Sequence, residues 1–163
     1  MFELSIENDN RILVRENGKE HSIPMALSYW NTNDLLMHWA YETYELLDGY
    51  GLKFLFTGMI QPQSLDYVRA FRVVRTRNYI HFDDVFIQSP WRVNSWNPKD
   101  IIDYLSSNSF QIVYDYQFGL EGRVPEFTIS VEELEKWHHG KLEASIPEGY
   151  RSEYELSSNA KSI

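Results

Sequence analysis

Residues 67–88 read YVRAFRVVRTRNYIHFDDVFIQ, and this stretch decides the class of fold. Two runs rich in β-branched and aromatic residues, 67–76 and 79–88, predict strands. Arg77 and Asn78 link the two runs, and asparagine tolerates the left-handed backbone conformation that tight two-residue turns use. The stretch therefore predicts an antiparallel hairpin.

Further strands are expected on both sides of this hairpin. Alternating or continuous apolar runs predict them at residues 2–6, 11–15, 52–60, 109–118 and 124–129. The run at 52–60 is apolar at almost every position, which is typical of a strand covered on both faces. Pro24 interrupts regular structure, so residues 23–30 are expected to form an ordered approach to the first helix.

The first helix has the clearest signals in the chain. It is expected to begin near Asn31 or Thr32, which are favourable N-caps, and to end at Gly49 and Gly51. One side of it carries Leu35, Leu36, Trp39, Ala40, Thr43, Leu46 and Leu47. The opposite side carries His38, Glu42 and Glu45.

Two shorter helices complete the expected elements. Asn97-Pro98 precedes a helix at residues 100–106, because proline is favoured in a first turn. Ser130 and Glu133 form a capping box that opens a last helix, which Gly140 is expected to end. The chain is therefore expected to be an α+β protein, an antiparallel β-sheet with two to three packed helices.

Length and composition indicate a soluble cytoplasmic protein. A chain of 163 residues with 43% apolar residues and no cysteine fits one globular domain in a reducing compartment. We expect residues 1–140 to form that domain and residues 141–163 to be an acidic, flexible tail. No apolar run approaches the ~20 residues of a membrane-spanning helix, and residues 1–7 lack the segments of a signal peptide.

Aromatic content and charge favour a binding protein. The chain has 11 tyrosines, 9 phenylalanines and 5 tryptophans, and its formal net charge is −9. Aromatic residues supply much of the energy of protein–protein contacts, and acidic excess favours basic partners over nucleic acid. The acids concentrate in residues 1–48 and 126–163. These parts are either solvated faces or an acidic docking surface, and both interpretations stay open.

Candidate catalytic and metal-binding residues are discounted by their spacing. His138 and His139 are consecutive at a helix end, where their side chains diverge by about 100°, so helix capping is favoured over metal binding. Asp83 and Asp84 on a strand point to opposite faces, so they cannot serve one substrate. The sequence lacks a phosphate-binding glycine loop and a Gly-x-Ser-x-Gly motif. We therefore expect no enzyme activity, no metal and no cofactor. An enzyme with an unrecognised site, which a deep polar pocket holding perturbed acids would indicate, is the least favoured alternative.

A single-stranded nucleic-acid-binding module is the alternative function. The cations and aromatics that would serve it are Tyr67, Arg69, Arg72, Arg75, Tyr79 and His81. The net charge of −9 opposes phosphate contacts. Pairing of these arginines with acids across the strands, including Asp66, Asp83, Asp84 and Asp115, is the favoured interpretation.

Trp91 and Trp96 bracket a loop between a strand and a helix. Exposing two tryptophans to water is costly, so they either cover the core or anchor a partner. Covering the core is favoured.

Several segments resemble the immunity proteins of bacterial contact-dependent growth inhibition systems, particularly the group paired with ribosomal-RNA-cleaving toxins. The most specific is IPMALSYW at residues 23–30, followed directly by an acidic amphipathic helix that contains Trp39. The order of later segments is similar too: LKFLFTG at 52–58, YIHF at 79–82, FI at 86–87, NPKDII at 97–102 and IS at 129–130. The resemblance covers roughly residues 2–137.

The resemblance implies a bacterial, cytoplasmic antitoxin without catalytic activity. It would bind the basic C-terminal nuclease domain of a cognate toxin one to one, block access of the RNA, and be a monomer when free. It also implies a Whirly-like sheet with packed helices. Leu27, Ser28, Tyr29 and Trp30 are taken as structural, so the resemblance assigns no contact residue.

The contact surface is expected to combine acids with aromatics, because a nuclease presents lysines and arginines. The candidate partner-binding residues are Asp83, Asp84, Trp91, Trp96, Asp100, Asp103, Asp115 and Tyr116.

Overall fold

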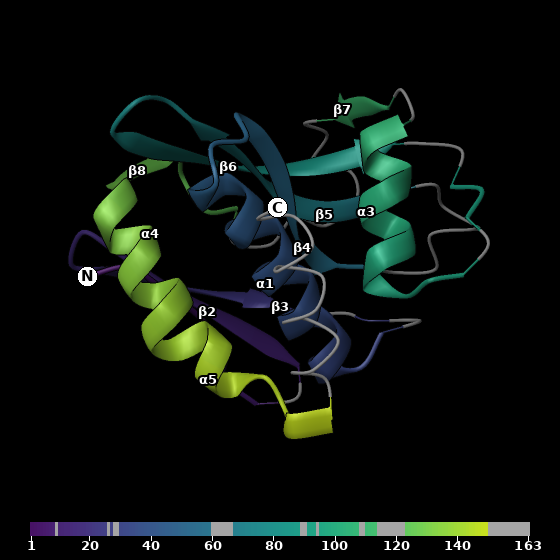
Figure 1. Ribbon diagram of the computed structural model, residues 1–163, viewed down its shortest axis with the longest axis horizontal. Helices are drawn as coiled ribbons and strands as arrows, with labels where there is room; N and C mark the ends of the chain where they lie inside the picture. Colours follow the sequence, from purple (N-terminus) through teal and green to yellow (C-terminus); the bar gives the residue numbers. More distant parts are fainter. Residues whose placement is uncertain are drawn as a thin grey trace.

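The computed structural model describes residues 1–8, 10–25, 27, 30–59, 67–88, 91–93, 95–107, 110–113 and 123–149. These residues form an α+β fold in which antiparallel sheets pack with three main helices, α1, α3 and α4 (Figure 1). The expected fold class is therefore confirmed.

The larger sheet has five strands. They are β4 (Leu52–Gly58), β5 (Tyr67–Arg75), β6 (Tyr79–Gln88), β7 (Gln111–Val113) and β8 (Phe127–Ser130). The order is β4-β5-β6, and all pairs are antiparallel. On the far side of the ten-residue β6, β8 pairs with its first half and β7 with its second half. β6 is therefore the central strand.

The hairpin of β5 and β6 is confirmed, but its turn differs from the expectation. The N–H of Thr76 donates to the carbonyl of Tyr79 at 2.9 Å, so Arg77 and Asn78 lie in the turn. Among the described residues, only Asn8 and Asn17 have a positive φ outside glycine. Asn78 therefore does not use the left-handed conformation.

A smaller sheet at the N-terminus has the order β1-β2-β3: β1 (Glu3–Ile6), β2 (Arg11–Glu16) and β3 (Lys19–Pro24). The sequence interpretation missed β3. Its signal is Asn17-Gly18, which takes φ values of 46° and 79° and closes the tight turn between β2 and β3. Phe2 joins the two sheets, because its ring centroid lies 5.0 Å from that of Phe82.

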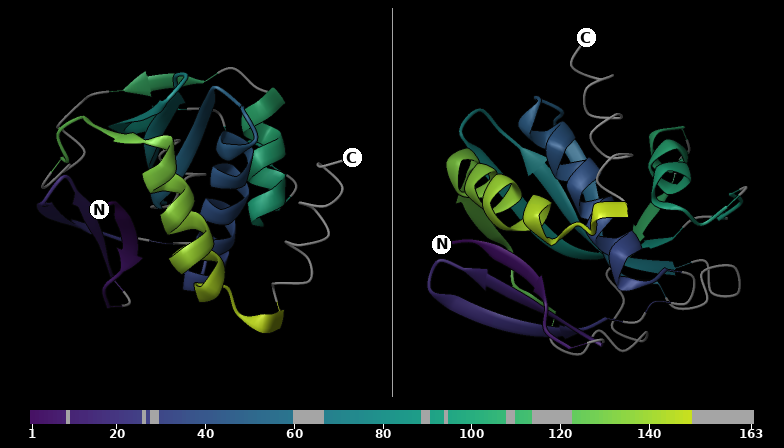
Figure 2. Two further views of the ribbon diagram at one scale, coloured as in Figure 1. Left: turned by 60° about the vertical axis from the view of Figure 1, so that its left-hand side comes forward. Right: turned by 60° about the horizontal axis from the view of Figure 1, so that its bottom comes forward.

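Helix α1 (Thr32–Leu47) lies between α4 (Val131–Trp137) and α3 (Pro98–Ser107) (Figures 1 and 2). Of the two N-caps expected for α1, Asn31 is the one observed, and the expected capping box at Ser130 is confirmed. Asn31 forms a capping box with Asp34, and Ser130 forms one with Glu133. A basic residue from β5 caps the C-terminal end of α1. Arg75 Nη1 donates hydrogen bonds to the carbonyls of Leu46 and Leu47.

The side of α1 that carries His38, Glu42 and Glu45 is buried, which the sequence interpretation did not anticipate. This side covers the free edge of β4. The N–H of Phe54 donates to Glu42 at 3.2 Å, and the N–H of Phe56 donates to His38 Nε2 at 3.0 Å. Glu45 pairs with Lys53 of the same strand. The polar side chains of α1 therefore satisfy the backbone of an edge strand that would otherwise be open to pairing.

The expected end of the last helix at Gly140 is wrong. The chain continues through a π-helical segment, η2 (His138–Leu142), into α5 (Glu143–Ser145). Leu142 and Ile146 are buried in the core, so packed structure extends past residue 140. The rest of the expected tail, residues 150–163, lies outside the described residues, and the division of the chain into a domain and a flexible tail stays a prediction. Within the described part, no helix has the length and apolar character needed to span a membrane.

Candidate functional site

The structure describes six of the eight predicted partner-binding residues. Asp83 and Asp84 belong to β6. Asp100 and Asp103 belong to α3, and Trp91 and Trp96 to the loop before it. Asp115 and Tyr116 lie outside the described residues.

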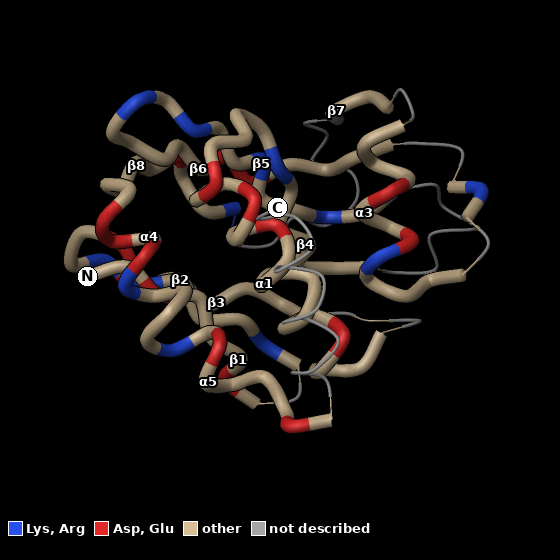
Figure 3. Tube along the Cα trace, viewed as in Figure 1, with Lys and Arg blue, Asp and Glu red and all other residues tan. Residues whose placement is uncertain are grey.

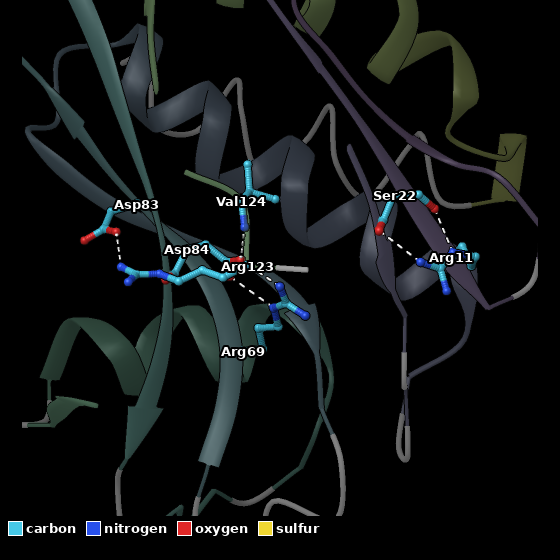
Figure 4. A network of polar contacts seen from close by, with 7 residues as sticks. All are labelled: Arg11, Ser22, Arg69, Asp83, Asp84, Arg123 and Val124. Carbon is cyan, nitrogen blue, oxygen red and sulfur yellow. Dashed lines mark hydrogen bonds and ion pairs between the residues drawn. The ribbon is translucent and has the colours of Figure 1, made fainter. Parts of the chain in front are cut away.

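Asp84 is part of the interior and not of the surface, which corrects its assignment as a contact residue. Its side chain is 1% exposed and forms a two-pronged ion pair with Arg69, at 3.0 and 2.7 Å (Figure 4). The N–H of Val124 donates to the same carboxylate at 2.9 Å. A carboxylate with three donors in a buried position holds β5, β6 and the segment before β8 together.

Asp83 is half-buried and is engaged within the protein. Arg123 Nη2 lies 3.2 Å from Asp83 Oδ1, and Arg123 Nε donates to the backbone carbonyl of Asp84. The favoured interpretation that arginines pair with acids is confirmed for Arg69, which pairs with Asp84. Arg75 instead donates hydrogen bonds to backbone carbonyls at the C-terminal end of α1. These two arginines are therefore not available to phosphate groups, which weighs against the nucleic-acid alternative.

Trp91 covers the core, as favoured from the sequence. It is 5% exposed, its ring stacks on Tyr104 at a centroid distance of 5.3 Å, and it meets Phe56 edge-on at 6.0 Å. Its interpretation as an anchor for a partner is corrected by this burial. Trp96 is half-buried, lies 6.0 Å from Trp91, and accepts a hydrogen bond at its carbonyl from the indole of Trp30.

Asp100 fixes the start of α3. Its backbone N–H donates to Asn97 Oδ1 at 2.8 Å, and its carboxylate accepts hydrogen bonds from Ser95 and Asn97. Asp103, one turn further along, is exposed. Asp100 thus positions the loop, whereas Asp103 presents its charge to solvent.

These residues surround a shallow depression of about 270 Å³. Its lining consists of Arg92, Val93, Asp100, Asp103, Tyr104 and Ser107. We refer to this lining together with Trp96 as the α3 surface. It brings together three of the predicted residues, Trp96, Asp100 and Asp103, and the ring of Trp91 stacks on Tyr104 of its lining. Tyr104 and Ser107 were missed, although their spacing from Asp100 places all three on one helix face.

The α3 surface combines polar side chains with aromatic ones. The polar side-chain groups that line the depression are two carboxylates, a guanidinium and two hydroxyls. Figure 3 shows further acids along α4, whereas Glu42 and Glu45 of α1 are buried and do not add charge to the surface. Such a surface complements a basic partner.

The buried histidine His38 lies apart from this surface and is structural. Burial lowers its pKa from 6.5 to about 3, with a smaller contribution from the positive charge of Lys53, so the ring is neutral. Its Nε2 accepts a hydrogen bond from the N–H of Phe56, and its ring packs against the rings of Phe56 and Trp30. Its role is to cover the edge of β4.

A cluster on the last helical segment combines two histidines with an acid. The donor atoms of His138, His139 and Glu143 lie within 4.8 Å of one another. The group is on the helix that follows β8, on the other side of α1 from α3 (Figure 1).

Comparison with known proteins gives a likeness of fold. No protein-family model matches the chain, and no curated protein sequence matches it. The fold is similar to that of a chain in a solved structure described as the CdiA-CT/CdiI toxin and immunity complex from Enterobacter cloacae. The TM-score is 0.60 and the sequence identity 15%, over 88% of this chain and 94% of that chain. At this identity, the likeness establishes the fold.

Proposed function

We propose that this protein is the immunity protein of a bacterial contact-dependent growth inhibition system. The observation that carries the proposal is the likeness of fold to a chain of a toxin and immunity complex, which covers most of both chains. The segments at residues 23–30 and 97–102 support it independently, because they resemble immunity proteins of this kind.

Charge favours the immunity role over the toxin role. A toxin that cleaves nucleic acid has to bind phosphates, and a net charge of −9 opposes such contacts. An immunity protein of this charge is attracted to the basic surface of a nuclease. We therefore propose that the partner is the basic C-terminal nuclease domain of a cognate toxin, bound one to one by a monomer in the bacterial cytoplasm. The protein acts without catalysis or a cofactor, by blocking access of the RNA.

We further propose that the α3 surface makes the contact. It combines the exposed carboxylate of Asp103 with the half-buried ring of Trp96 over a rigid base formed by Trp91 and Tyr104. Aromatic groups on a rigid base lose little conformational entropy on binding, and an exposed acid meets a lysine or arginine without prior rearrangement.

The function is tested by binding and inhibition in the same samples. The full chain is titrated into the C-terminal domain of the toxin encoded beside it, and nuclease activity is measured at each ratio. We expect one-to-one binding with a Kd in the nanomolar range and loss of nuclease activity at equivalence. A folded chain that does not bind contradicts the proposal. Binding of RNA or single-stranded DNA at physiological salt would instead support the nucleic-acid alternative.

The surface is tested by a charge reversal with a matched control. Asp103→Lys on α3 and Glu135→Lys on α4 both reverse one exposed acid in a helix. Asp103→Lys should weaken binding by about 2 kcal/mol, roughly 30-fold in Kd, if the carboxylate meets a buried cation. Glu135→Lys should change Kd less than about threefold. If both variants bind like the wild type, the α3 surface is excluded while the immunity function stands.

A further inference from the structure

The π-helical segment η2 changes which side chains share a face. The N–H of Glu143 donates to the carbonyl of His138, a bond that spans five residues and marks the wide turn. In an α-helix, the residue stacked below His138 would be Leu142. The wide turn instead brings Glu143 toward His138, while Glu143 also lies four residues after His139. The sequence-based expectation that the two histidines diverge assumed ordinary helical geometry, and η2 removes that assumption.

A hydrogen bond to α1 sets the orientation of the buried His138 ring. Nδ1 lies 2.6 Å from the hydroxyl oxygen of Thr43. That hydroxyl donates its proton to the carbonyl of Trp39 at 2.7 Å, so it accepts from Nδ1–H of His138. The lone pair of the ring is therefore on Nε2, which lies 3.9 Å from Glu143 Oε1. A metal-binding histidine is typically held by a hydrogen bond of this kind at its second nitrogen.

The other two side chains complete a set of donors on the solvent side. His139 Nδ1 lies 2.5 Å from Glu143 Oε1, and the two histidine rings are perpendicular, with centroids 4.8 Å apart. His139 is exposed and Glu143 half-buried, so both can rotate and an ion can enter from solvent. Around a tetrahedral zinc ion with bonds of about 2.0–2.1 Å, ligand atoms lie roughly 3.3 Å apart. Small rotations of the two outer side chains reach that spacing.

The chemistry of the donors selects the ion. Two imidazoles and one carboxylate form a set typical of zinc, whereas Ca²⁺ and Mg²⁺ prefer oxygen ligands.

We propose that His138 Nε2, His139 Nδ1 and the carboxylate of Glu143 form a binding site for one zinc-type divalent metal ion. Three protein ligands leave a fourth position for water or for a side chain of a partner. The site joins the helix after β8 to α1 through Thr43 and is independent of the toxin-binding function.

The test is a titration of the tag-free, metal-free full chain with Zn²⁺. Calorimetry and competition with a coloured chelator each measure the binding. Saturable one-to-one binding with a Kd below about 10 μM is expected. Co²⁺ should give the visible absorption bands of a four-coordinate site. No saturation by about 1 mM Zn²⁺ would overturn the proposal.

Variants of the two outer ligands separate this site from adventitious binding. His139→Ala and Glu143→Gln should each weaken Zn²⁺ binding at least tenfold, and neither removes a buried side chain. His81→Asn removes an exposed histidine on β6 and should leave Kd within about twofold. Equal Zn²⁺ affinity in all three variants and the wild type would show that the histidine cluster is not the site.

Discussion

Asp83 and Asp84 are neighbours in the sequence, yet their carboxylates lie in different surroundings. Asp84 is buried against Arg69, whereas Asp83 is half-buried beside Arg123, which is itself partly open to water. Alternation on a strand predicts that the two point to opposite faces, and this is confirmed. Which of the two faces is interior depends on elements distant in sequence, so the sequence alone could not distinguish the structural acid from the accessible one.

Replacement of these two acids by asparagine tests the difference. Asp84→Asn leaves the guanidinium of Arg69 buried without a countercharge, so the free energy of unfolding should fall by about 3 kcal/mol or more. Asp83→Asn should reduce it by no more than about 1 kcal/mol, because its partner is screened by solvent. Urea unfolding of both variants measures the difference. Equal losses would contradict the assigned role of Asp84.

His38 makes stability depend on pH. Its pKa is 6.5 in the unfolded chain and about 3 in the fold, so the unfolded state binds more protons between these values. The contribution of neutral His38 is therefore complete above about pH 6.5 and is lost as pH falls toward 3, with a slope approaching about 1.4 kcal/mol per pH unit. Urea unfolding at several pH values should show a shallower slope for His38→Gln than for the wild type. Parallel pH profiles would contradict the burial of a neutral ring.

Elements with local signals were predictable, and those that depend on distant partners were not. The capping boxes at Asn31 and Ser130 involve residues three positions apart, so their sequence suffices. Burial of Glu42 depends on β4, which packs against it from another part of the chain. The π-helical turn was missed because glycine is a common helix terminator. Leu142 and Ile146, which follow Gly140, are buried in the core, and such tertiary packing cannot be read from the local sequence.

The cover that α1 provides for the edge of β4 can be tested at Glu42. Glu42→Leu leaves the N–H of Phe54 buried without this acceptor, so the free energy of unfolding should fall by about 1–3 kcal/mol. Glu42→Gln keeps an acceptor oxygen, so its free energy of unfolding should fall by less than half as much as that of Glu42→Leu. Thermal or urea unfolding of the two variants measures this. A leucine variant as stable as the glutamine variant would show that the edge does not need this side chain.

At the scale of the whole molecule, the net charge of −9 predicts how the association rate responds to salt. The attraction between a chain of charge −9 and a basic nuclease domain is long-ranged, so it acts before contact and is screened by ions. Between about 0.05 and 0.5 M salt, kon should fall about tenfold or more, while koff changes little. Stopped-flow mixing measures both. A kon that is insensitive to salt would contradict electrostatic attraction to a basic partner.

The placement of the tryptophans provides a built-in optical reporter. Trp30, Trp39, Trp91 and Trp137 are each 5% exposed or less, whereas Trp96 is half-buried on the loop before α3. The emission wavelength of an indole depends on its contact with water, so four of the five emitters are already shielded. A partner that covers α3 therefore removes water from the indole of Trp96 alone and shifts the fluorescence emission of the unlabelled protein to shorter wavelength. A partner that binds at α4 leaves the emission spectrum of this chain unchanged.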